Sequence, residues 1–322
     1  MTVQRTVLVT GINGSVGGAT AQTLLRDGWR VRALARDPKR LMQAWPTEVE
    51  WVEGDALDAG TVSKAAQGTR LIVHAVSPPQ YRNWRKWAVP MLANAIDASV
   101  QAGARLIFPG NVYNYGPDAG GVVREDSPQH PVTRKGAIRV EMEGMLRTAV
   151  EERGLRALVV RAGDYFGSTA ATSAFAQVIL PTKPGAPVRY LGDFEVGHSW
   201  AYLPDLAEAI TQLAARDEKL HAWETFNFGG HWLPRGVEIA EAVRRATRNP
   251  APVRSFPWLL VRIAAPVYPL ARELAEMRYL WQTPLKLDNA KLTALLGTEP
   301  HTTLDEAVQT AIAGLKRMVN PK

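Results

Sequence analysis

The stretch "VLVTGINGSVGGATAQTLLRDG" (residues 7–28) places Gly11, Gly14 and Gly17 where a short apolar run passes into a pattern of helical period. Glycine permits the tight turn that a chain needs when it passes directly from a strand into a helix. It also lets backbone N–H groups approach a pyrophosphate, whose negative charge the helix N-terminus favours. The stretch therefore predicts a dinucleotide-binding strand–turn–helix unit. The residues expected to hold the cofactor there are Thr10, Gly11, Asn13, Gly14, Ser15, Val16 and Gly17.

The chain around this stretch alternates apolar runs with helical patterns. Strands are expected at 6–10, 31–35, 49–53, 71–76, 105–109 and 157–161, and helices at 16–27, 38–44, 58–67, 84–102 and 135–153. Such alternation predicts an α/β fold, a Rossmann-like doubly wound parallel sheet with helices on both faces. After Gly167 the rhythm changes, with helices expected at 205–217, 236–248, 258–281, 288–296 and 303–317. We expect residues 1–167 to form the nucleotide-binding domain, and residues 168–322 to form mainly a smaller C-terminal substrate lobe, with some segments returning to the sheet.

Composition excludes several classes of site. The chain has 322 residues, of which 46% are hydrophobic and 21% charged, and it has no cysteine. Disulfides, thiolate metal sites and a cysteine nucleophile are therefore excluded, and no metal is expected. The net charge of +7 comes from scattered Lys and Arg, which does not favour a nucleic-acid surface. The expected partner is a small-molecule substrate, and the expected state is a monomer or homodimer.

The longest apolar run is "FPWLLVRIAAPVYPLA" (256–271), which Arg262 and three prolines interrupt. It is too short and broken to span a bilayer, so we expect no membrane partner and interpret it as part of a core helix. The first residues contain no apolar run typical of a secretory signal. Cytoplasmic residence is therefore the default expectation.

The end of the second expected strand indicates which dinucleotide binds. An acid there would hold the ribose 2′-hydroxyl of NAD, but the stretch "ALARDPKR" (33–40) places Arg36 at that point, with Lys39 and Arg40 behind it. Positive charge suits a 2′-phosphate, so NADP is favoured over NAD. The alternative is that these are solvated basic residues and that Asp37 accepts the ribose hydroxyl.

The glycine spacing Gly-x-x-Gly-x-x-Gly, with Thr10 ahead of it, resembles the short-chain dehydrogenase/reductase superfamily, particularly its extended, epimerase-like branch. The segments "NVYNYGPD" (111–118), "ALVVRAGDYFG" (157–167) and "FNFGG" (226–230) are similar to segments of that branch. The resemblance implies further cofactor contacts by Asp55, Ala56, His74, Ala75, Val76, Gly163 and Asp164. Three alternatives remain open: Asp55 or Asp58 caps a helix, His74 is a packed core histidine, and Asp164 forms an ion pair with Arg139.

The catalytic motif departs from the family pattern. The Tyr-x-x-x-Lys of the family becomes Lys135-Gly136-Ala137-Ile138-Arg139. Lys135 and Arg139 are one helical turn apart on the same face. A lysine that is partly desolvated beside another cation can exchange a proton near neutral pH, so Lys135 is the candidate acid. Arg139 stands at the position of the family's lysine, and the resemblance implies that it contacts the nicotinamide ribose and supplies charge. The segment also resembles the isoflavone-reductase-like branch, in which a lysine takes the role of the tyrosine. The alternative for Lys135 is a solvated residue in a helix capped by Thr133.

Other candidates surround this motif. Asn111 occupies the position of the family's serine, where its amide could polarise a substrate oxygen; alternatively it turns the chain after a strand. Tyr113 is a second candidate proton donor, whereas Tyr115 is expected to pack. His198 and Trp200 are expected to contact substrate, unless the aromatic residues of the lobe only pack it.

The function expected from these features is NADP(H)-dependent oxidation or reduction of a carbonyl or conjugated small molecule, without the usual tyrosine. Two alternatives remain: a nucleotide-sugar epimerase or dehydratase with altered catalysts, and a non-catalytic NADP-binding sensor of the NmrA-like kind.

Overall fold

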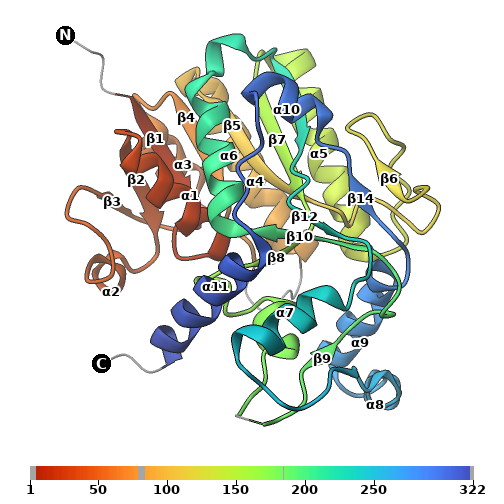
Figure 1. The fold of residues 1–322 in the computed structure, drawn as a ribbon. Helices are drawn as coiled ribbons and strands as arrows, with labels where there is room; N and C mark the ends of the chain where they lie inside the picture. The colour runs from red at the N-terminus through yellow and green to blue at the C-terminus, as the bar shows by residue number, and fades with distance from the viewer. Residues whose placement is uncertain (1–4, 79–83, 184, 320–322) are drawn as a thin grey trace.

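A seven-stranded parallel sheet forms the centre of the molecule, with helices on both faces (Figure 1). The computed structural model describes residues 5–78, 84–183 and 185–319. The strand order is β11-β7-β5-β4-β1-β2-β3, and every neighbouring pair is parallel. The predicted Rossmann-like doubly wound sheet is confirmed. Its strands are β1 (Thr6–Thr10), β2 (Arg30–Ala35), β3 (Glu50–Glu53), β4 (Leu71–His74), β5 (Arg105–Asn111), β7 (Arg156–Ala162) and β11 (Trp223–Asn227).

Alternate residues of each strand face opposite layers, as the buried strands of a two-faced sheet require. In β1, Val7 and Val9 pack under α1 (Ser15–Arg26) and α6 (Leu203–Ala215). Leu8 packs on the other face, under α3 (Ala59–Ala66), α4 (Trp84–Ala102) and α5 (Arg134–Arg153). The short α2 (Pro38–Met42) follows β2. The predicted helices of the first half are confirmed within a few residues at each end.

The second half contributes both to the sheet and to a separate lobe. β11 pairs with β7 and completes the main sheet, and α6 packs beside α1. The lobe has its own core, in which Phe166, Tyr190 and Trp200 are fully buried. Its elements are β8 (Asp164–Phe166), a π-helix (Phe175–Ile179), β9 (Arg189–Tyr190), β10 (His198–Tyr202), β12 (His231–Leu233), α7 (Glu238–Ala246), β13 (Arg254–Ser255) and α11 (Leu304–Val319). The remaining short elements are β6 (Val122–Val123), a 3-10 turn (Asp217–Lys219), β14 (Lys286–Leu287) and α10 (Ala290–Leu296).

The helix predicted over 258–281 is divided into three pieces. These are α8 (Trp258–Ala264), α9 (Pro269–Glu276) and a 3-10 helix (Met277–Trp281). Pro266 and Pro269 explain the break, since proline removes a backbone donor and its ring clashes with the preceding turn. No residue of α8 is buried, so the prediction of a core helix is wrong there. Within the described residues, no helix is long and apolar enough to cross a bilayer.

Candidate active site

The candidate site lies at the carboxyl edge of the main sheet. β1 pairs with β2 on one side and with β4 on the other, so the direction of the strand order reverses at β1. In open α/β sheets a ligand binds in the crevice outside the carboxyl ends of the strands at such a reversal. Thr10, His74 and Asn111 are the last residues of β1, β4 and β5. The fold therefore brings most of the residues predicted for the site to one edge.

The glycine turn is built so closely that side chains are excluded from it. Gly11 has φ +82°, and a β-carbon there would lie 2.6 Å from the backbone nitrogen of Val76. A β-carbon on Gly17 would lie 2.3 Å from the carbonyl oxygen of Gly11. Gly14, the N-cap residue of α1, offers no side-chain acceptor to the first turn of the helix. Uncapped N–H groups behind an exposed glycine fit the anionic pyrophosphate of a dinucleotide.

The turn after β2 carries exposed positive charge. Arg36 directly follows β2 and is exposed, as are Lys39 and Arg40. The carboxylate of Asp37 accepts a hydrogen bond from the backbone N–H of Arg40 at 3.2 Å and caps α2. Asp37 therefore has a structural role, while Arg36 is exposed just beyond the carboxyl end of β2.

Asp55 and Asp58, the two acids after β3, have different structural roles. Asp58 caps α3 by accepting from two backbone N–H groups, at 2.9 and 3.2 Å. Asp55 closes a short turn by accepting from the backbone N–H of Leu57 at 3.0 Å, and Ala56 beside it is buried. The capping role therefore belongs to Asp58, and the adenine contact of Asp55 stays a prediction.

His74 is enclosed in the sheet. Its ring is 3% exposed, lies 6.3 Å from the ring of Phe108 and shares a 3.3 Å hydrogen bond with Thr10. Burial, reinforced by the charge of Arg139, lowers the pKa of His74 to about 3. The interpretation of His74 as a packed core histidine is confirmed, and its side chain offers no surface to a cofactor. The neighbouring Ala75 and Val76 are partly exposed.

The first turn of α5 brings Lys135 to the loop after β5. Thr133 caps the helix as predicted, by accepting from the N–H of Gly136 at 3.0 Å. Gly136 lies so close to the loop that a β-carbon there would come within 2.2 Å of the carbonyl oxygen of Tyr113. Lys135 itself is only 7% exposed, which excludes the alternative of a solvated lysine. Its role in proton transfer stays a prediction.

The side chain of Asn111 stabilises the turn after β5 and keeps its Nδ2 amide group as a hydrogen-bond donor. Its side-chain oxygen accepts from the backbone N–H of Tyr113 at 3.0 Å. This is the structural role that the sequence offered as an alternative. It leaves the Nδ2 group as the part of the amide that could bond a substrate oxygen. Asn111 is 8% exposed, at the end of β5.

Arg139 is held between two aromatic rings. Its guanidinium carbon lies 5.1 Å from the ring centroids of both Trp84 and Phe108. One guanidinium nitrogen donates to the carbonyl oxygen of Pro109 at 3.3 Å, near the end of β5. Its contact with the cofactor ribose stays a prediction.

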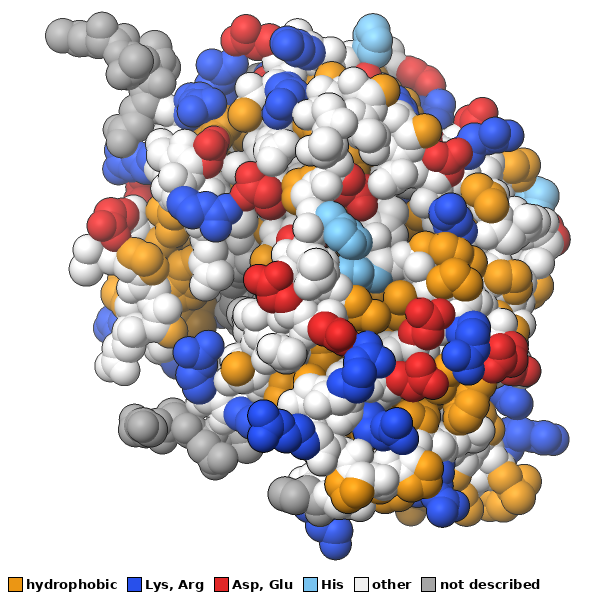
Figure 2. All heavy atoms as spheres, in the orientation of Figure 1, with side chains coloured by type: hydrophobic (Ala, Val, Ile, Leu, Met, Phe, Trp, Pro, Cys, Tyr) orange, Lys and Arg blue, Asp and Glu red, His pale blue; other side chains and the backbone are white. Residues whose placement is uncertain are grey.

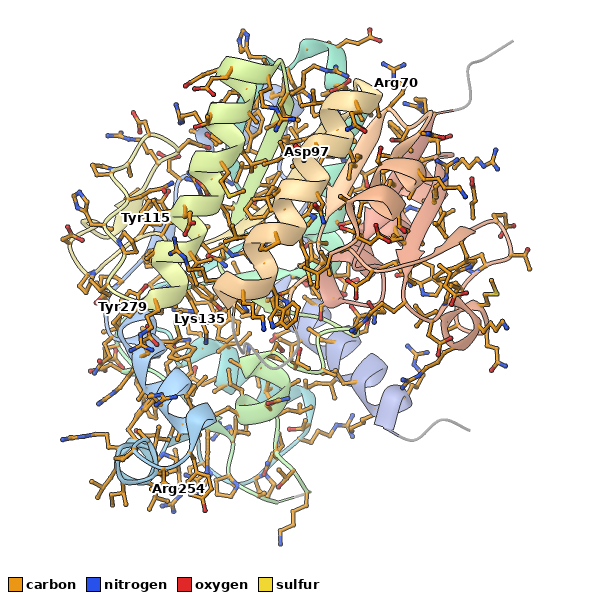
Figure 3. The ribbon with its side chains drawn as sticks, turned by 180° about the vertical axis from the view of Figure 1, so that it is seen from behind. Arg70, Asp97, Tyr115, Lys135, Arg254 and Tyr279 are labelled. Carbon is orange, nitrogen blue, oxygen red and sulfur yellow. The ribbon has the colours of Figure 1, made fainter. Side chains whose placement is uncertain are left out.

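Two tyrosines near α5 differ from the acid that the family uses. Burial raises the pKa of Tyr115 to about 12, and the ring packs in the core as expected. The hydroxyl of Tyr279 donates to the carbonyl oxygen of Tyr115 at 3.0 Å, and Figure 3 shows it near Lys135. Burial and the nearby charge of Glu276 raise the pKa of Tyr279 far above its usual range. Neither phenol has the lowered pKa that proton transfer near neutral pH requires.

Asp164 forms a pair with His198 instead of the predicted pair with Arg139. Trp281 Nε1 donates to its Oδ2 atom at 2.8 Å, and His198 Nε2 lies 2.9 Å from the same oxygen. The other ring nitrogen of His198 lies 3.1 Å from the carbonyl oxygen of Leu280, so both nitrogens face acceptors. Sequence reasoning missed Trp281, because it placed this residue inside a long helix.

His198 and Trp200, the two residues of the lobe predicted to contact substrate, differ in their contacts with the candidate site. His198 borders the candidate site through Asp164. Trp200 is fully buried, with its ring 6.4 Å from that of Phe166 and 5.2 Å from that of His198. This placement fits the alternative in which aromatic residues pack the lobe, and it leaves no surface of Trp200 for substrate.

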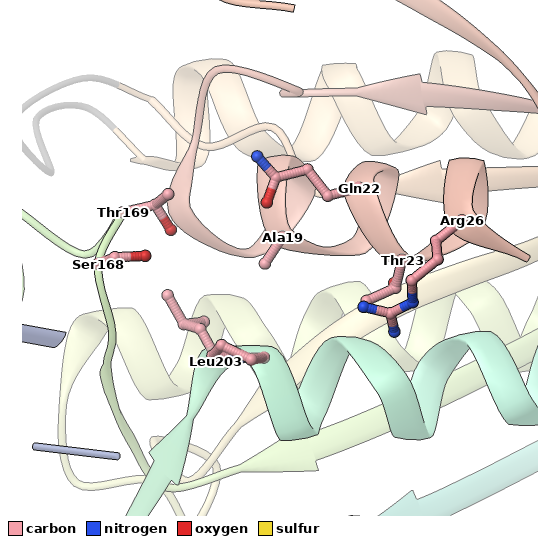
Figure 4. A pocket seen from close by; sticks show the side chains of 8 residues that line it. Ala19, Gln22, Thr23, Arg26, Ser168, Thr169 and Leu203 are labelled. Atoms are coloured by element: carbon pink, nitrogen blue, oxygen red, sulfur yellow. The ribbon is translucent and has the colours of Figure 1, made fainter. Parts of the chain in front are cut away.

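A small pocket beside the glycine turn is separate from these residues (Figure 4). It has a volume of about 100 Å³ and lies between α1, the loop after β8 and the start of α6. Ser15 contacts the same loop by donating to the carbonyl oxygen of Thr169 at 3.0 Å. Among the described residues, no group of three or more His, Asp or Glu side chains could hold a metal ion.

Comparisons with known proteins agree with this geometry. The sequence model of the NAD dependent epimerase/dehydratase family matches residues 7–229. UDP-glucose 4-epimerase of Azospirillum brasilense is 26% identical over 181 residues, which cover 52% of this chain and 50% of that protein. The chain thus spans about half the length of the curated relative that it matches.

Solved structures share the fold over almost the whole chain. MoeE5 in complex with UDP-glucose and NAD has a TM-score of 0.77 at 21% identity, covering 98% of this chain and 99% of that one. UDP-glucuronic acid 4-epimerase from Bacillus cereus, in complex with UDP-glucuronic acid and NAD, has a TM-score of 0.79 at 16% identity, covering 97% and 99%. At these identities the likeness shows the fold alone.

Proposed function

The chain belongs to the NAD dependent epimerase/dehydratase family. From that premise, we propose that it is a cytoplasmic enzyme that uses a nicotinamide dinucleotide. It exchanges hydride with a hydroxyl-bearing carbon or a keto carbon of a small molecule. A nucleotide sugar is the first candidate substrate. The observation that carries the proposal is the glycine turn at the reversal point of the sheet, with Lys135 and Asn111 at the same edge. The curated relative acts on a UDP-sugar, and two structures of the same fold hold UDP-sugars with NAD.

The cofactor would lie across the carboxyl edge of the sheet. Gly11, Gly14 and Gly17 would hold its pyrophosphate against the first turn of α1, and Asp55 would bond its adenine. A nicotinamide ring bound at this edge would supply reversible hydride exchange. The NAD dependence of the family and the NAD held by solved structures of the same fold support NAD.

The chain's own groups would handle the proton and the substrate oxygen. The Nδ2 group of Asn111 would donate to that oxygen and stabilise the charge that develops on it. Lys135 would pass a proton at Nζ, in the role that tyrosine has elsewhere in the family. Asp164, fixed by His198 and Trp281, would orient a substrate hydroxyl through its Oδ1 atom.

One observation favours a second candidate, an NADPH-dependent reductase of carbonyl or conjugated compounds. Arg36, Lys39 and Arg40 are exposed just beyond β2, where the 2′-phosphate of NADP would lie. In that case Arg36→Asp would weaken NADPH binding and leave NADH binding nearly unchanged.

The test begins with the cofactor and continues with turnover. Purified protein is denatured, any released dinucleotide is identified by chromatography, and NAD⁺, NADH, NADP⁺ and NADPH are titrated by calorimetry. UDP-glucose and UDP-glucuronic acid are then assayed for epimerisation, and a panel of carbonyl compounds for NAD(P)H oxidation. Epimerisation with retained NAD supports the first candidate, and oxidation of NADPH by the panel supports the second. Stoichiometric dinucleotide binding without any turnover would show a sensor and overturn both.

A further inference from the structure

α8 and the turn after it present an apolar surface to solvent. Among the described residues, eight large hydrophobic side chains are strongly exposed, and five of them lie within residues 259–268. We call these five the α8 patch: Leu259 (67% exposed), Leu260 (64%), Ile263 (68%), Val267 (74%) and Tyr268 (65%). A cluster of this density marks an interaction surface, since single exposed hydrophobic residues are normally scattered.

The α8 patch is fixed to the lobe by a tryptophan. Trp258 Nε1 donates to the carbonyl oxygen of Leu191 at 2.7 Å, and its ring lies 6.1 Å from that of Trp281. The helical turn continues past α8, because the N–H of Tyr268 bonds the carbonyl oxygen of Ala264 at 2.8 Å. Leu259, Ile263 and Val267 are four residues apart, so they share one face of this turn. The apolar face is therefore held outward by an anchored helix.

The stretch of sequence that contains the patch is basic. From residue 242 to residue 272 the chain has no Asp or Glu and six arginines. Arg254, Arg262 and Arg272 of this stretch are exposed. Figure 2 shows hydrophobic side chains with Lys and Arg side chains around them at the end of the molecule that carries α8, and Figure 3 shows Arg254 at the same end. An apolar helix face flanked by arginine is typical of helices that lie in the interface of an anionic bilayer.

The same charges disfavour a second copy as the occupant. In a symmetric dimer the same patch occurs on both subunits, so each exposed arginine would meet a surface with the same positive charge. A phospholipid surface instead supplies phosphate groups to the arginines and acyl chains to the leucines.

We propose that the α8 patch docks the protein on an anionic phospholipid surface. Leu259, Leu260, Ile263 and Val267 insert between the headgroups, and Arg262 contacts lipid phosphates. Trp258 is the anchor of this surface, and it packs on Trp281, whose indole N–H bonds Asp164. The docked surface and the candidate active site thus share one aromatic support. The proposal stands on the surface alone and does not depend on the reaction catalysed.

The test is vesicle flotation of the full-length protein. Vesicles of phosphatidylcholine alone are compared with vesicles that also contain phosphatidylglycerol, at low and high salt. We expect binding to the anionic vesicles that salt weakens. The double variant Leu259→Ser/Ile263→Ser should lower the partition coefficient about ten-fold or more, and Arg262→Glu should lower it at low salt. The matched control is Val122→Ser/Val132→Ser, which removes two exposed hydrophobic residues elsewhere and should bind like the unmodified protein.

Three results would overturn the proposal. One is the absence of the protein from the vesicle fraction at low salt. Another is equal binding of the Leu259→Ser/Ile263→Ser variant and its control. The third is a dimer in light scattering that this variant converts to monomer, which would assign the patch to a second copy. Since every substituted residue is exposed, circular dichroism should show unchanged folding in all variants.

Discussion

Arg161 and Asp164 lie three residues apart in the chain, yet their charged groups differ in burial and in hydrogen-bond partners. Arg161 is 2% exposed and makes two hydrogen bonds to Glu143, at 3.1 and 2.7 Å. Asn114 and Gln129 also donate to this carboxylate, each at 2.9 Å. Both carboxylate oxygens are thus satisfied, and the cluster ties the loop after β5 to α5 and β7.

Asp164 is 16% exposed, and its Oδ2 atom makes both hydrogen bonds, one with His198 Nε2 and one with Trp281 Nε1. Within the described residues, no hydrogen bond reaches its Oδ1 atom. Both carboxylate oxygens of Glu143 have hydrogen-bond partners, whereas the carboxylate of Asp164 makes its hydrogen bonds through one oxygen and is partly exposed. The comparison predicts that the first cluster governs stability and the second governs turnover.

The largest effect is expected from breaking the enclosed pair. Glu143→Ala leaves the guanidinium of Arg161 buried without its carboxylate, which should lower the free energy of unfolding by about 3–5 kcal/mol. Denaturant unfolding measures this loss. Glu141→Ala is the control on the same helix, because it breaks an exposed pair with Arg85 and should cost about 1 kcal/mol or less. Similar losses in both variants would contradict the structural role of the Arg161 cluster.

The next effect concerns Lys135 and assumes the proposed hydride-transfer activity. Lys135→Met should lower kcat about 100-fold, since it removes the proton donor, and should leave the dinucleotide Kd nearly unchanged. Lys135→Arg sharpens the test, because arginine keeps the positive charge but does not release a proton. If Lys135→Arg keeps full kcat, Lys135 supplies charge only. Arg134→Met, at the exposed neighbouring position, is the control.

A third effect concerns His74, an enclosed group that is neutral at pH 7. Its pKa is about 3 in the folded protein, against an ordinary value of 6.5, so below pH 6.5 the unfolded chain binds a proton that the folded chain does not. Stability is therefore fully present above pH 6.5 and falls by about 1.4 kcal/mol per pH unit as the pH drops toward 3. His74→Gln should remove about 2–3 kcal/mol of the loss between pH 6.5 and 4.5.

Unfolding free energies measured across this pH range test the slope. An unchanged slope in His74→Gln would mean that the ring takes up its proton without unfolding.

The smallest effect is expected from Asp164→Asn, which removes the charge and keeps the shape. We expect kcat to fall about ten-fold and the free energy of unfolding to fall by less than about 2 kcal/mol. Glu143→Gln should show the reverse, with a larger loss of stability and a smaller change in kcat. If Asp164→Asn destabilises the protein as much as Glu143→Ala does, the Asp164–His198 pair belongs to the fold.

The sequence predicted the elements that local patterns determine. The strands and helices of the first half follow from apolar runs and helical periodicity, and the glycine turn follows from its spacing within a strand–helix unit. The same reasoning failed for 258–281, where an apolar composition suggested burial. α8 is apolar and exposed, so composition alone does not distinguish a core helix from a docking surface.

Only the part of the candidate site that lies within one local motif could be predicted from the sequence. Lys135 and Arg139 lie in one helix, and their common face follows from their spacing. The partners of Asp164 come from β10 and from the 3-10 helix, 34 and 117 residues away in the chain. No local pattern indicates such a contact, and the ion pair predicted between Asp164 and Arg139 is wrong. Aromatic rings from α4 and β5 hold Arg139 instead.

The seventh strand has a consequence for synthesis of the protein on the ribosome. β11 covers the outer edge of β7 through five parallel residue pairs, yet it follows β7 by about 60 residues. Until residue 227 has left the exit tunnel, the apolar β7 is an unprotected edge that could pair with another nascent chain. Translation past this point therefore closes the sheet, and a truncation that removes β11 should aggregate even though the glycine turn is intact.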